Sequence, residues 1–129
     1  MANDSRPLSP HLQVYRWQVT MFLSILHRMT GFGLAAGAVM VTWWLMAAVL
    51  GEAQFNAFHA FTQSCLGKLM LMGWLWAFVF HFMNGIRHLV WDTGRGFTIK
   101  QAANSAWFVL IASLLGTLAI WCFASGGAV

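Results

Sequence analysis

Charged side chains are scarce in this chain: Lys, Arg, Asp and Glu make up 8% of its 129 residues. A soluble domain carries about 25% charged residues, so this chain lacks the polar surface needed to face water on all sides. Hydrophobic residues make up 60% of the chain, and eight Trp and eleven Phe add to the apolar excess. The composition excludes a soluble globular domain and predicts an integral membrane protein.

A basic patch and a cysteine cluster are also absent. The net charge of +4 comes from only seven Lys and Arg residues, which are scattered, so we expect no nucleic-acid partner. The two cysteines, Cys65 and Cys122, form no CxxC pair and are expected to be free thiols. The N-terminal segment lacks a short apolar run with a cleavage site, which predicts a bacterial polypeptide inserted through its own first helix.

Three stretches are uncharged for long enough to cross a bilayer as a helix, which takes about 20 residues. The first lies between Arg28 and Glu52, and the third begins near a capping-box pattern of Thr98 and Gln101. We predict an all-α membrane protein with a single domain and three transmembrane helices, at residues 24–51, 68–91 and 101–125.

Basic residues are distributed unevenly around these spans. Only Lys68 lies in the first connection, and the other six of the seven are Arg6, Arg16, Arg28, Arg87, Arg95 and Lys100. Because loops rich in Lys and Arg stay in the cytoplasm, we expect residues 1–23 and 92–100 to be cytoplasmic. The connection 52–67, predicted to form a short amphipathic helix at the membrane surface, and the C-terminus are then periplasmic. The chain is therefore expected to be a multi-pass protein of the bacterial inner membrane.

This topology brings polar residues from the first two helices to the cytoplasmic membrane surface. They are Ser24, His27, Arg28, Arg87, His88 and Asp92. Ionisable groups at membrane depth are costly and are candidates for function. Two arginines and two histidines at one level suit an anionic group such as a haem propionate. The alternative is a set of anchors that extend toward lipid headgroups.

His81 lies seven residues before His88, roughly 10 Å deeper in the membrane. At about 100° per residue, His81, Gly85 and His88 share one helix face. This face offers an imidazole, a gap where a flat macrocycle can press on the backbone, and a second polar group. Imidazole is a usual axial ligand of haem iron. The alternative is a histidine that hydrogen-bonds to a neighbouring helix.

Ser24 and Arg28 lie one turn apart on the same helix face. A hydroxyl donor beside a cation suits a quinone, since the serine can bond a carbonyl oxygen and the arginine can stabilise negative charge during reduction. The alternative is an ordinary helix cap with an interface anchor.

Three ordered motifs built on these residues resemble the cytochrome b556 subunit of succinate dehydrogenase, the larger membrane anchor of respiratory complex II. The motifs are RPLSPHL at residues 6–12 with Tyr15 and Trp17, SILHR at residues 24–28 with Thr30 and Gly31, and His81 followed by GIRH at residues 85–88 and Asp92. The resemblance covers nearly the whole chain.

The resemblance implies that His81 is an axial ligand of haem b and that the second axial histidine comes from a smaller anchor subunit. His27, Arg28 and His88 are then expected near the haem propionates. The fold implied is a heteromeric helix bundle shared with that second anchor.

The resemblance also implies a ubiquinone site bordered by Ser24 and Arg28, with Trp17 and Ile25 as apolar walls. Asp92 is expected to act in proton delivery. Succinate is oxidised at a flavoprotein subunit and electrons reach the quinone through an iron–sulfur subunit, so this chain alone does not oxidise succinate. The competing interpretations are a structural anchor without haem, the anchor of a fumarate reductase, and a small transporter or proton-conducting subunit.

Overall fold

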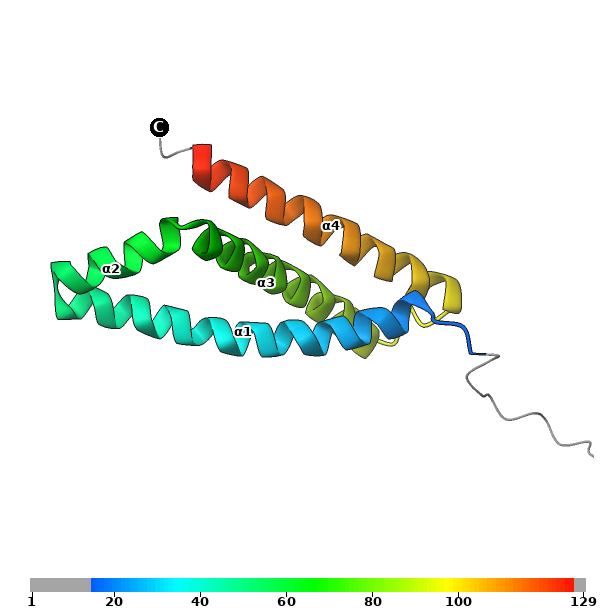
Figure 1. Cartoon of the computed structure of the whole chain (residues 1–129). Coiled ribbons are helices and arrows are strands. Elements are labelled where there is room, and N and C mark those ends of the chain that lie inside the picture. Colours follow the sequence, from blue (N-terminus) through cyan, green and yellow to red (C-terminus); the bar gives the residue numbers. More distant parts are fainter. Residues whose placement is uncertain (1–14, 127–129) are drawn as a thin grey trace, which may run out of the picture.

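The structure, a computed structural model, describes residues 15–126 of the chain. Within that range, four helices follow one another (Figure 1): α1 (Val19–Leu50), α2 (Glu52–Gln63), α3 (Cys65–Asp92) and α4 (Ile99–Gly126). Neighbouring long helices run antiparallel, and α1, α3 and α4 are each long and apolar enough to cross a membrane. The prediction of an all-α membrane protein with three transmembrane helices is confirmed.

Each long helix begins earlier than the span predicted for it. α1 begins at Val19 and α3 at Cys65, ahead of the predicted starts at residues 24 and 68. α4 begins at Ile99, where the Thr98 hydroxyl accepts a hydrogen bond of 3.3 Å from the backbone N–H of Gln101. The motif at residues 6–12 lies outside the described residues.

The first connection folds as α2 and packs back onto the end of α1. The Trp43 ring meets Phe58 edge-on at 5.0 Å and Phe61 at 5.3 Å between ring centroids. At the corner into α3, the Ser64 hydroxyl accepts a hydrogen bond of 3.0 Å from the Gly67 N–H and caps the helix. A Cβ at Gly67 would overlap the Phe61 carbonyl, so this corner requires glycine.

A small apolar core forms where the three long helices meet. Its buried residues are Leu23 of α1, Phe80 of α3, and Ala106 and Val109 of α4. Farther along, the Trp74 indole of α3 lies directly on Gly37 of α1, where a Cβ would overlap it. Small residues let helices approach closely where lipid provides no hydrophobic driving force. These contacts place the start of α1 beside the end of α3 (Figure 1).

Candidate functional site

Three histidines come together where the early part of α1 packs against the late part of α3. The rings of His27 and His81 stack, with centroids 3.8 Å apart and an angle of 14° between their planes. The His88 ring lies 5.5 Å from His27. The sequence placed His27 at the level of His88, but its ring lies closer to the deeper His81. The antiparallel packing of α1 and α3 thus creates a cluster from residues far apart in the sequence.

Thr30 and Gly31 hold the His81 ring from the side of α1. The Thr30 side chain is buried, and its Oγ1 lies 3.2 Å from His81 Nδ1. The same hydroxyl donates a hydrogen bond of 2.9 Å to the His27 carbonyl. A Cβ at Gly31 would lie 3.3 Å from His81 Cε1, so the ring rests against the bare backbone. Neither residue was predicted to have a role, although Thr30 lies on the same helix face as His27.

The surroundings of His81 suit a flat macrocycle. In the described part of the chain no hydrogen bond engages His81 Nε2, and a Cβ at Gly85 would meet nothing within 4 Å. His27 Nδ1 is buried and has no hydrogen-bond partner among the described residues. Buried polar atoms normally have partners, so this one is explained by a group that the chain itself does not supply. The residues present therefore fit a haem, for which the imidazole of His81 is a suitable ligand type.

The described residues contain no group of three or more His, Cys, Asp or Glu side chains that could hold a metal ion. The histidine cluster is therefore not a metal centre complete within the described chain.

Arg87 differs from its expected place beside the haem. Its guanidinium points between α3 and α4, where Nε donates to Ser105 Oγ at 2.8 Å and Nη2 donates to the Ala102 carbonyl at 3.0 Å. Nη1 also donates to Asn84 Oδ1 at 3.4 Å, and the side chain is only 6% exposed. Arg87 thus ties α3 to α4, whereas the Arg28 side chain, which follows His27 in the sequence, is exposed on α1.

The candidate quinone residues lie at the same end of the bundle with exposed side chains. Ser24, Ile25 and Arg28 are exposed along the early part of α1, and Asp92 is exposed at the end of α3. Trp17 precedes α1 and is 67% exposed. Hydrogen bonds among the described residues include none from Ser24, Arg28 or Asp92, so these groups are open to a ligand or a partner.

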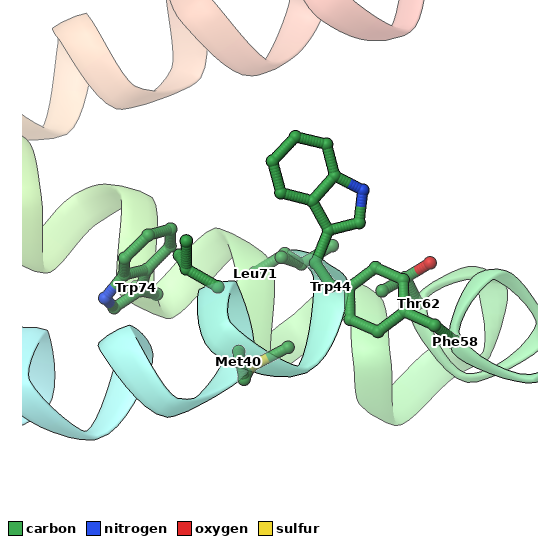
Figure 2. Close-up of a pocket in the computed structure, with 7 residues that line it drawn as sticks. Met40, Trp44, Phe58, Thr62, Leu71 and Trp74 are labelled. Carbon is green, nitrogen blue, oxygen red and sulfur yellow. The ribbon is translucent and has the colours of Figure 1, made fainter. Parts of the chain in front are cut away.

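An apolar pocket of about 370 Å³ lies near the opposite end, among α1, α2 and α3 (Figure 2). Its lining residues are Met40, Val41, Trp44, Phe58, Thr62, Leu71 and Trp74. The Thr62 hydroxyl already donates to the His59 carbonyl, at 3.0 Å. Besides this hydroxyl, the indole N–H groups of Trp44 and Trp74 are the polar groups of the lining, which contains no charged side chain to bind a charged cofactor.

Residues 2–120 match the family described as "Succinate dehydrogenase/Fumarate reductase transmembrane subunit". The chain belongs to this family. The "Succinate dehydrogenase cytochrome b556 subunit" of Rickettsia felis is 40% identical over 118 residues, which cover 92% of each chain. The protein of the same name from Paracoccus denitrificans is 43% identical over 111 residues, 86% of this chain and 85% of that one.

A mitochondrial succinate dehydrogenase subunit is similar to the chain to about the same degree. The "Succinate dehydrogenase cytochrome b560 subunit, mitochondrial" of Sus scrofa is 39% identical over 122 residues, 91% of this chain and 70% of that one. The resemblance to succinate dehydrogenase cytochrome b subunits is thus confirmed. The chain is a membrane subunit of an enzyme of this family, which leaves a separate small transporter without support.

Proposed function

We propose that this chain anchors a succinate:ubiquinone oxidoreductase in the bacterial cytoplasmic membrane, provides one axial ligand of haem b, and forms part of the ubiquinone-reduction site. His81 carries the proposal, because its Nδ1 is engaged by Thr30 while Nε2 has no partner in the described chain. The names of the relatives, cytochrome b subunits of succinate dehydrogenase, support a haem at this position.

His81 would hold the haem through Nε2, and a histidine of a second, smaller anchor subunit would occupy the other axial position. His27, His88 and Arg28 would pair with the propionates through N–H donors and positive charge. When bound, the haem supplies a one-electron carrier within the membrane. The residues of this chain orient that carrier and balance its charge.

Ubiquinone would be reduced beside Ser24 and Arg28. The Ser24 hydroxyl donates a hydrogen bond to one quinone carbonyl, and the Arg28 guanidinium stabilises the negative charge that develops on the oxygen as electrons arrive. Trp17 and Ile25 provide apolar contact with the ring. Conversion to ubiquinol takes two electrons and two protons, and the exposed Asp92 carboxylate at the end of α3 offers a route for the protons.

The other subunits complete this site. The exposed positions of Trp17, Ser24 and Arg28 need covering groups from a second anchor and from an iron–sulfur subunit that delivers electrons from a flavoprotein. A quinone pocket has to exclude water to strengthen these polar contacts. The succinate dehydrogenase names of the relatives favour quinone reduction over fumarate reduction as the working direction.

Purification from membranes through a tag on this chain tests the proposal. Three further subunits and a Soret band are expected, with a reduced-minus-oxidised spectrum typical of a low-spin cytochrome b. Copurified dehydrogenase subunits without a Soret band would contradict haem binding and leave a structural anchor.

Orientation is a separate prediction from the six-to-one distribution of basic residues. A reporter fused after Val129 is expected to behave as periplasmic, and a reporter inserted in the loop of residues 93–98 as cytoplasmic. Alkaline phosphatase and fluorescent-protein fusions measure the two cases. A cytoplasmic signal from the C-terminal fusion would overturn the topology and the placement of the quinone site on the cytoplasmic side.

A further inference from the structure

Thr30 is a buried hydroxyl at the centre of the histidine cluster. Its side chain is 5% exposed, and it contacts two histidines at once. Oγ1 lies 2.9 Å from the His27 carbonyl on its own helix and 3.2 Å from His81 Nδ1 on α3. The other threonine with a backbone hydrogen bond on α1, Thr42, bonds only the Ala38 carbonyl, at 2.9 Å.

The hydrogen bonds determine which His81 nitrogen carries the proton. A threonine hydroxyl has one proton and accepts through its lone pairs. Since a carbonyl only accepts, the Thr30 hydroxyl donates to His27, and the proton of the second bond comes from His81 Nδ1. In the reverse arrangement Nε2 would carry a proton at membrane depth with no acceptor among residues 15–126. Only in the Nδ1–H form do the Thr30 hydroxyl proton and the imidazole proton of His81 each have a hydrogen-bond acceptor.

We propose that Thr30 is a positioning residue that holds His81 in its Nδ1–H tautomer and directs Nε2 at the haem iron. The inference rests on the proposed haem function and goes further, because it assigns a role to a residue that acts through its hydrogen bond to His81. Metal-bound histidines commonly donate their second N–H to a neighbouring acceptor, which fixes the tautomer and the ring plane and raises the basicity of the ligand.

Gly31 also helps to position the His81 ring. A Cβ at residue 31 would lie 3.3 Å from His81 Cε1, which is closer than ordinary contact, and 3.8 Å from Nδ1, so glycine leaves room for the ring beside the backbone. The ring is thus held by a hydrogen bond at its edge and by the helix backbone beside it. Both contacts come from α1, which therefore fixes the plane of the ring.

The test compares Thr30→Val with Thr30→Ser and Thr42→Val in the assembled complex. Thr30→Val keeps the branched shape and removes the acceptor, so haem retention against a scavenging apoprotein is expected to fall about 10- to 100-fold. The haem midpoint potential is expected to rise, because a less basic imidazole stabilises the ferric state less. The g values of the oxidised haem are expected to change with the ring plane. Thr30→Ser restores the hydroxyl and should restore all three measurements.

Thr42→Val removes a comparable hydroxyl from the same helix without touching a histidine, and it is expected to match the wild type. If Thr30→Val does not accumulate, Thr30→Ala removes the hydroxyl without adding bulk and gives the same readouts. A wild-type potential and wild-type g values in the Thr30 variant that assembles would overturn the positioning role. The ligand role of His81 in the proposed function is judged separately on His81→Ala: wild-type haem in that variant would overturn that role, whatever the Thr30 variants show.

Discussion

His81→Ala is expected to abolish the low-spin haem signal of the assembled complex. His81 is the histidine whose Nδ1 is anchored to a second helix, and no hydrogen bond among the described residues engages its Nε2. Alanine offers no ligand to the iron. His27 is not expected to replace His81, because the two rings stack face to face and the nitrogens of His27 do not point toward the position of His81. The measurement is a reduced-minus-oxidised spectrum of purified complex, with subunit content checked on the same sample.

Two other histidines give matched controls for this experiment. His59→Ala is expected to leave the spectrum unchanged, because His59 is exposed on α2, at the opposite end of the bundle. His88→Ala is expected to retain haem with a shifted potential or weaker binding, since it would act on the propionates and not on the iron. A bis-histidine spectrum that survives in His81→Ala would refute the ligand assignment.

Ser24→Ala and Arg28→Leu are expected to reduce quinone reductase activity sharply while succinate still reduces an artificial soluble acceptor. A lost hydrogen bond to an oxygen that develops charge costs on the order of 2 kcal/mol, which corresponds to about a 30-fold slower step. The soluble acceptor takes its electrons before they reach the membrane site, so its rate should be preserved. Both rates are measured on the same membranes.

Ser125→Ala and Lys68→Leu are the matching controls at the far end of the bundle. Ser125 is near the end of α4, and Lys68 is in the first turn of α3. Neither change is expected to alter quinone reduction. Full quinone reductase activity in both Ser24→Ala and Arg28→Leu would contradict the site, and parallel loss of both activities would point to failed assembly instead.

The three spans could be predicted from the sequence because uncharged runs of this length have no stable alternative to helices that cross a bilayer. The helix starts could not be predicted as well. α1 begins after Gln18, which makes no side-chain capping bond, so the sequence carries no signal there. The start of α3 did carry a signal, the Ser64 cap three residues before Gly67, whereas the charge of Lys68 had suggested a later start.

The sequence predicts the relative positions of site residues only where they lie on the same helix. His81 and His88 share a face because of their spacing alone, and that spacing is readable in the sequence. The direction of Arg87 depends on which face of α3 meets α4, and Ser105 and Ala102 give no hint of this by themselves. The role of Thr30 likewise depends on the register between α1 and α3, which a single sequence does not specify.

The close contact between Gly37 and the Trp74 indole constrains how the two positions can change over evolutionary time. A side chain at residue 37 would overlap the indole, so a mutation there is tolerated only after residue 74 has become smaller. A smaller residue at 74 alone would leave a void between α1 and α3 that weakens their packing. Substitution at either position is thus disfavoured until the other has changed, and the pair is expected to vary jointly among descendants of this chain.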